Sequence, residues 1–221
     1  MPTLSFSGQL INLFAALLLL ISFAMLTQRR ILSLINLYAL QGFVLALSTF
    51  VVGYSTQNGH LYVSASVTLA LKVLLVPWGL HWLIRKLNVR WDVESVVNIP
   101  VQMLIGIVLV IFAFNLAAPI SEMAGTITKS TLGIAIASIL LSFLMMITRR
   151  KAVSQVIGFL AMENGLFFAA ASATYGMPMI VELGILFDVL VGALIFGVFF
   201  LHIRETFESL DIHHLEKLKE R

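Results

Sequence analysis

The sequence contains no cysteine, and only 11% of its 221 residues are charged. Without thiolates the chain offers no ligands for an iron–sulfur cluster and no disulfide, and we expect it to carry no cofactor. A soluble domain has roughly 25% charged residues, whereas 60% of this chain is hydrophobic. Such a composition excludes a soluble globular protein.

The sequence also lacks the motifs of soluble enzymes. It has no phosphate-binding glycine loop, no His or Cys set with metal-ligand spacing and no Ser-His-Asp constellation. We therefore expect a non-catalytic protein with no metal site, no small-molecule substrate of its own and no nucleic-acid partner.

Long apolar stretches recur along the whole chain. A helix needs about 20 residues to cross a hydrocarbon layer about 30 Å thick. Seven segments meet this requirement, at 8–27, 31–54, 62–84, 100–117, 131–148, 152–175 and 179–203. We predict an all-α, multi-pass protein of the cell (inner) membrane with seven transmembrane helices. The first segment is not a cleaved signal peptide, because its basic pair follows the apolar run instead of preceding it.

The basic residues between the predicted spans separate by side. Lys129 is the only one in the loops of one side. The opposite side carries twelve, namely Arg29, Arg30, Arg85, Lys86, Arg90, Arg149, Arg150, Lys151, Arg204, Lys217, Lys219 and Arg221. Basic residues favour the cytoplasmic side. The sequence therefore predicts an N-terminus outside the cell and a C-terminus in the cytoplasm.

The chain shows signs of an internal repeat. Arg29-Arg30 recur as Arg149-Arg150, Lys72 maps near Asp188, and Ile84-Arg85 map onto Ile203-Arg204. We predict a three-helix repeat at 1–90, a linker with an extra fourth helix at 91–130, a second repeat at 131–204 and a cytoplasmic tail at 205–221. The odd fourth helix makes the two repeats parallel. The alternative is that any two hydrophobic triplets align this well.

Three ionisable residues fall near the middle of predicted spans. Lys72, Glu163 and Asp188 each lie about 15 Å from a span end at about 1.5 Å per residue. Each costs about 2.5–3.5 kcal/mol at that depth, so we expect them to face the interior, and such residues are functional candidates by default. The alternative is a lysine–carboxylate pair that only fixes helix register.

Other features add weaker signals. Asp188 lies between Gly184 and Gly192 on one helical stripe, which allows close helix packing. Pro77 predicts a kink beside Lys72. Glu182, near the outer surface, is more readily explained as a solvated group. His81 and His202, near the cytoplasmic ends of two spans, are candidate points where protons enter, although interfacial anchoring is the better single explanation for them. Gln41 is expected to form an ordinary interhelical hydrogen bond.

Three motifs carry a resemblance to a known family. They are Met162-Glu163-Asn164-Gly165, Lys72 through Pro77, and Val181-Glu182-Leu183-Gly184-Ile185 followed by Asp188. Over nearly its whole length, including the tail from Leu210 to Lys219, the chain resembles component E of hydrogenase-4-type formate hydrogenlyases. Its last three helices are also similar to the K-type subunit of respiratory complex I and the C-type subunit of multisubunit cation/proton antiporters.

The resemblance implies a membrane subunit of a hydrogenase complex, linked to proton or sodium movement while soluble partners oxidise formate and evolve hydrogen. Its expected partners are antiporter-like membrane subunits, the hydrogenase module and the lipid bilayer. Glu163 matches the first buried acid of the K-type proton path, and Asp188, with Glu182 as rival, matches the second. Gln41 and Lys72 depart from the pattern in the first repeat, where Lys72 would act as a countercharge.

The resemblance therefore leads to a lateral proton relay made of Glu163, Asp188, Lys72 and Glu182. Three alternatives stay open: a purely structural adaptor between larger subunits, a subunit of a cation/proton antiporter, and a freestanding transporter. Against the last, the sequence shows no pair of broken helices around a substrate-sized site.

Overall fold

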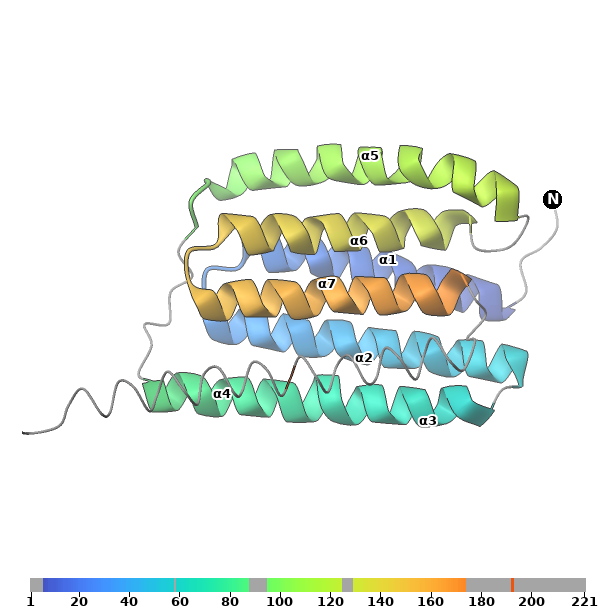
Figure 1. Ribbon diagram of the computed structural model, residues 1–221, viewed down its shortest axis with the longest axis horizontal. Helices are drawn as coiled ribbons and strands as arrows, with labels where there is room; N and C mark the ends of the chain where they lie inside the picture. The colour runs from blue at the N-terminus through green and yellow to red at the C-terminus, as the bar shows by residue number, and fades with distance from the viewer. Residues whose placement is uncertain (1–5, 58, 88–94, 125–128, 174–191, 193–221) are drawn as a thin grey trace, which may run out of the picture. The chain divides into compact units, whose positions relative to one another are not determined.

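The computed structural model describes residues 6–57, 59–87, 95–124, 129–173 and Gly192. The chain divides into two compact units, Met1–Ile185 and Leu186–Arg221, and every described helix belongs to the first. The helices are α1 Phe6–Thr27, α2 Ile31–Thr56, α3 Gly59–Thr68, the π-helix η1 Leu69–Leu75, α4 Val76–Leu87, α5 Ile99–Ala124, α6 Lys129–Thr148 and α7 Ala152–Ala173 (Figure 1). The described residues contain no β-strand, which agrees with the predicted all-α class.

Among the described residues, six helical segments are long and apolar enough to cross a membrane, and they coincide with the first six predicted spans. The third of these segments, Gly59–Trp82, is a continuous helix that consists of α3, η1 and the first part of α4. Apart from Gly192, the predicted seventh span, 179–203, lies outside the described residues. The chain is thus a helical protein consistent with multi-pass membrane insertion, while the orientation of its termini stays a prediction.

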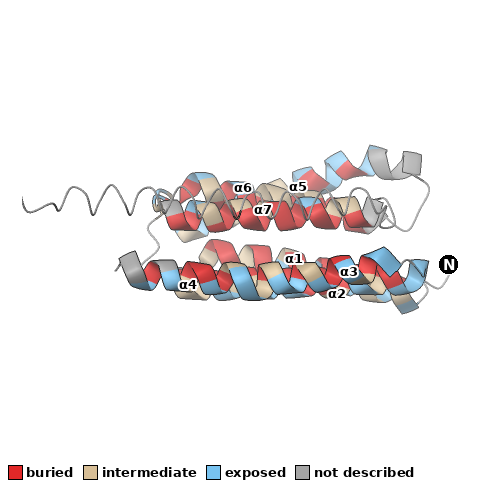
Figure 2. Ribbon diagram, turned by 60° about the horizontal axis from the view of Figure 1, so that its bottom comes forward, coloured by how far each residue is buried: buried red, intermediate tan, exposed pale blue. Residues whose placement is uncertain are grey.

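The described helices of the first unit pack in two layers, with α1 to α4 in one and α5 to α7 in the other (Figure 2). Contacts between the layers join α1 to α6 and α2 to α7, and α5 packs on α6. Leu34, Ile35, Leu141 and Ile157 are among the fully buried side chains. α1 therefore packs against α6, and α2 packs against α7. α6 and α7 are the first and second helices of the predicted second repeat.

α2 and α3 form a helical hairpin with a short connection. Gln57 adopts a left-handed conformation at φ 52°, and its backbone N–H bonds to the Gly53 carbonyl. The Phe50 and Tyr62 rings then pack edge to face across the two helices, with centroids 5.0 Å apart. The hairpin brings η1 alongside α2.

Two glycines one heptad apart bring α7 against α6. A Cβ added at Gly165 would lie 2.8 Å from Ile139 Cγ1 and 3.2 Å from its backbone nitrogen. One added at Gly158 would lie 3.2 Å from the Met146 nitrogen. The face of α7 that carries these glycines thus packs against α6. Glu163 lies on a different face of α7 and does not point towards α6.

The segment beside Pro77, where the sequence predicts a kink, is a π-helix. The backbone N–H of Val76 bonds to the Leu71 carbonyl, five residues earlier, and α4 begins at Val76. Proline has no N–H to continue the α-helical ladder, and a π-helical turn accommodates an extra residue at that point. Lys72 lies in the middle of η1.

Candidate functional site

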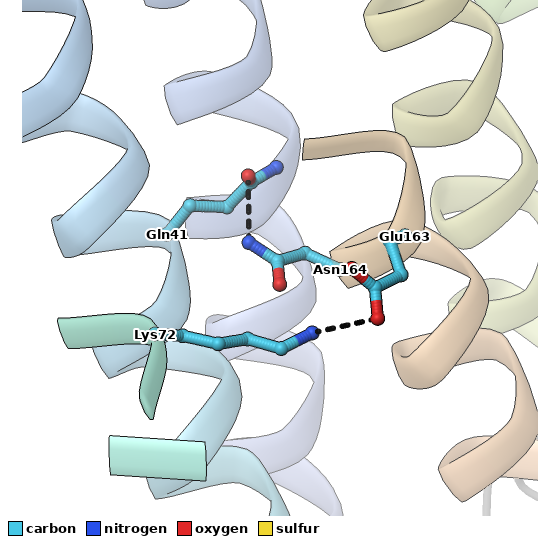
Figure 3. A network of polar contacts seen from close by, with 4 residues as sticks. All are labelled: Gln41, Lys72, Glu163 and Asn164. Carbon is cyan, nitrogen blue, oxygen red and sulfur yellow. Dashed lines mark hydrogen bonds and ion pairs between the residues drawn. The ribbon is translucent and has the colours of Figure 1, made fainter. Parts of the chain in front are cut away.

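Lys72 and Glu163 form a buried ion pair in the first unit (Figure 3). Lys72 Nζ lies 3.7 Å from Glu163 Oε1, and the two side chains are 2% and 7% exposed. This separation is longer than a hydrogen bond. The structure thus brings together two of the three charges that the sequence predicts near the middle of spans, although they stand 91 residues apart in the sequence.

A close helix contact sets the position of the lysine. A Cβ added at Gly42 on α2 would lie 3.0 Å from Lys72 Cβ, so a larger residue at this position would require η1 or α2 to shift. Lys72 Nζ also lies 5.5 Å from the centroid of the Phe167 ring on α7. The ammonium group is therefore held between α2 and α7.

Two amides link α1, α2 and α7 beside the ion pair. Asn164 Nδ2 donates to Gln41 Oε1 at 3.1 Å, and Gln41 Nε2 donates to Ser22 Oγ at 3.2 Å. Gln41 and Asn164 are fully buried, and Figure 3 shows their side chains meeting next to the pair. The interhelical hydrogen bond expected for Gln41 is confirmed.

Two acceptor oxygens of this cluster are left without a hydrogen bond from any described residue. Glu163 Oε2 and Asn164 Oδ1 are buried and have no hydrogen-bond partner among the residues that the structure describes. A buried polar atom without a partner costs about 1–3 kcal/mol. The carboxylate therefore has one oxygen available to a water molecule or a proton donor.

The remaining predicted site residues are not joined to the pair in the described part of the chain. His81 on α4 is half-buried, and its Nδ1 lies 2.8 Å from the Pro77 carbonyl, to which the ring N–H donates. Asp188, Glu182 and His202 lie outside the described residues. Their roles, like those of Lys72 and Glu163, stay predictions.

Arg149 is buried, which the amino-acid sequence did not indicate. Its Nη2 donates to the carbonyls of Met25 and Leu26 at 3.2 and 2.7 Å, and the residue is 2% exposed. Burial lowers the pKa of this guanidinium from its usual range. In sequence Arg149-Arg150 look like Arg29-Arg30, and both Arg29 and Arg30 are exposed. Only the packing of α6 on α1 distinguishes them.

The described residues hold no group of three His, Asp or Glu side chains that fits a metal ion. The polar side chains that do meet are a lysine, a glutamate, two amides and a serine. Such a set is able to hold a proton and orient its neighbours, and it lacks the ligand set of a metal centre.

Proteins similar to this chain match it over nearly its whole length. Uncharacterized protein Rv0085 of Mycobacterium tuberculosis is 30% identical over 212 residues, which cover 96% of both chains. Hydrogenase-4 component E of Escherichia coli is 23% identical over 212 residues, covering 96% of this chain and 98% of that protein. No model of a protein family and no solved structure matches the chain. This chain therefore belongs to the family of Rv0085, and hydrogenase-4 component E is a more distant full-length relative.

Proposed function

We propose that the chain is a non-catalytic membrane subunit of a hydrogenase complex of the formate hydrogenlyase type. The full-length similarity to hydrogenase-4 component E supports this assignment. The chain would lie among antiporter-like subunits of the inner membrane and next to the module that evolves hydrogen. Proton or sodium translocation by the complex would then use groups that this chain provides.

Within that complex, Glu163 would act as a proton carrier of a lateral relay and Lys72 as its coupled cation. The observation that carries this proposal is the buried Lys72–Glu163 contact at 3.7 Å. At this distance the charge of each group depends strongly on that of the other. A proton that arrives at or leaves Glu163 therefore changes the field at the lysine. Asp188, or its rival Glu182, would be the next acid along the relay.

The Glu163→Gln substitution tests this role. Glutamine keeps the shape of the side chain and removes the titratable group. Because it also leaves Lys72 without its countercharge, the yield of assembled complex is measured in parallel, and proton uptake is expressed per hydrogen molecule evolved. Proton uptake by membrane vesicles per hydrogen molecule evolved should fall severalfold, because general acid–base groups typically contribute about 100-fold or more to a transfer step. Thr49→Val is a matched control, since this buried hydroxyl bonds only to the Leu45 carbonyl of its own helix. Unchanged uptake in Glu163→Gln would refute the role.

A structural adaptor is the second candidate, and the amide contacts between α1, α2 and α7 favour it. Such contacts fix helix register without any proton movement. This candidate predicts that Glu163→Gln lowers the yield of the complex, while the complex that does assemble retains its normal ratio of protons to hydrogen. Measuring the yield and the ratio on the same preparation separates the two functions.

A further inference from the structure

The hydrogen bonds on the α2 side of the pair end at a backbone carbonyl. Asn164 donates to Gln41, and Gln41 donates to Ser22 Oγ. Ser22 Oγ in turn donates to the Leu18 carbonyl at 2.9 Å. Amide groups keep their protons at neutral pH, so this branch orients side chains without passing protons. A proton that enters from water must reach the pair along another face.

The face of α3 that leads to Lys72 is polar along its whole length. Four hydrogen-bonding side chains follow one another at intervals of four residues, which places them on one helical stripe: His60, Ser64, Thr68 and Lys72. His60 is exposed at the first turn of α3, whereas the other three are at most 1% exposed. The stripe thus runs from the surface of the first unit to its buried ion pair.

The two hydroxyls in the middle of this stripe lack the usual partner. Buried serine and threonine hydroxyls in helices commonly bond to a carbonyl of the preceding turn. Thr49 does so with Leu45, and Ser66, on α3 itself, does so with Tyr62 at 2.8 Å. Ser64 Oγ and Thr68 Oγ1 are buried and have no hydrogen-bond partner in the described part of the chain.

Among the described residues, the buried hydroxyls of Ser138 and Ser154 also lack a partner, each as the only such hydroxyl on its helix. Among the described helices, only α3 has two such hydroxyls. They lie one turn apart on the stripe that leads to the buried Lys72. Polar groups without protein partners commonly bind buried water. Successive positions on the stripe are about 6 Å apart along the axis, which two hydrogen bonds of about 2.9 Å through one water molecule span.

We propose that Ser64 and Thr68 hold a file of water molecules that connects the Lys72–Glu163 pair with the aqueous surface at His60. The file is about 18 Å long, from twelve residues at about 1.5 Å each. Each hydroxyl or water accepts one proton from one neighbour as it gives its own to the next, so the file itself is unchanged after each transfer. This path rests on the proposed function in that it supplies the relay with protons from water.

Single-cysteine variants test water access directly, because the chain has no cysteine of its own. Ser64→Cys, Thr68→Cys and His60→Cys are made in the full chain and studied in sealed membrane vesicles. The probe is the silver ion, which is small enough for a file of water and binds thiolates. It is added to one side of the vesicles at a time. Thiols left unreacted are then counted with a maleimide after denaturation.

The matched control is Thr49→Cys, the same substitution at a residue that is 1% exposed and satisfied within its own helix. Ser64→Cys and Thr68→Cys should react at least about tenfold faster than this control, because a thiol ionises and reacts only where water reaches it. They should react from the same side as His60→Cys. Rates equal to that of the control, or reaction only from the opposite side, would overturn the proposal.

A blocking variant tests the path itself. In Ser64→Leu/Thr68→Cys, leucine fills the stripe between His60 and the reporter thiol, so silver should react with that thiol at least about tenfold more slowly than in Thr68→Cys alone. An unchanged rate would show that water does not pass Ser64. If one cysteine variant does not accumulate in the membrane, the other carries the test by itself.

Failure of this inference differs from failure of the proposed function. Silver reactivity reports water along α3 whether or not the complex pumps protons. Normal proton uptake in Glu163→Gln would refute the relay and leave the water file in place. Unreactive thiols together with lost uptake in Glu163→Gln would refute the file and leave the relay.

Discussion

The buried ion pair makes a quantitative prediction about stability. Two unit charges 3.7 Å apart attract each other by about 4.5 kcal/mol at an effective dielectric constant of about 20. A single charge left alone in the middle of a membrane helix costs about 2.5–3.5 kcal/mol. Removing either Lys72 or Glu163 by itself should therefore destabilise the protein far more than removing both.

A double-mutant cycle measures this difference. Lys72→Met and Glu163→Leu, each made alone, should lower the free energy of unfolding by roughly 3–5 kcal/mol, because each leaves an uncompensated buried charge. The double variant should lose less than about 1.5 kcal/mol, since side chains of similar volume replace a neutralised pair. The coupling energy would exceed that of any surface ion pair, which is worth about 0–1 kcal/mol.

The assay is reversible unfolding in mixed micelles, titrated with a denaturing detergent and followed by tryptophan fluorescence. Thr49→Val, a buried hydroxyl away from the pair, controls for the general effect of a substitution in a helix interior. If the losses of the two single variants simply add in the double variant, Lys72 and Glu163 are not coupled. The reasoning from their separation would then be refuted.

Two further predictions follow from close contacts. Gly42→Ala should lower the free energy of unfolding by about 1–2 kcal/mol, because its Cβ would lie 3.0 Å from Lys72 Cβ and overpacking outweighs the gain of about 1 kcal/mol in helix propensity. Gly59→Ala is the control, since a Cβ there meets nothing within 4 Å; equal effects in the same detergent titration would contradict the prediction. Arg149→Gln should cost about 2–3 kcal/mol through two lost charge-assisted hydrogen bonds, and the exposed Arg150→Gln less than about 0.5 kcal/mol. Similar thermal unfolding of the two arginine variants would show that the buried contacts contribute nothing.

The ion pair shows how much of the site could be predicted from the sequence. Counting residues from the span ends placed Lys72 and Glu163 at one depth, and the cost of a charge in hydrocarbon required an interior position. Depth alone does not say which charges meet, because that depends on the rotation and order of helices far apart in the chain. Gly42 was not singled out, since nothing local distinguishes a glycine that faces η1 from one that faces lipid.

By itself, the sequence determined the helical class and the positions of six spans, because hydropathy over about 20 residues is a local property. It also predicted which polar residues lie at membrane depth. Tertiary structure alone decided that Glu163 meets Lys72, that Gln41 bridges Ser22 and Asn164, and that one arginine of two similar pairs is buried. Those outcomes depend on which helix faces pack together, and packing is a property of contacts between segments that lie up to 124 residues apart.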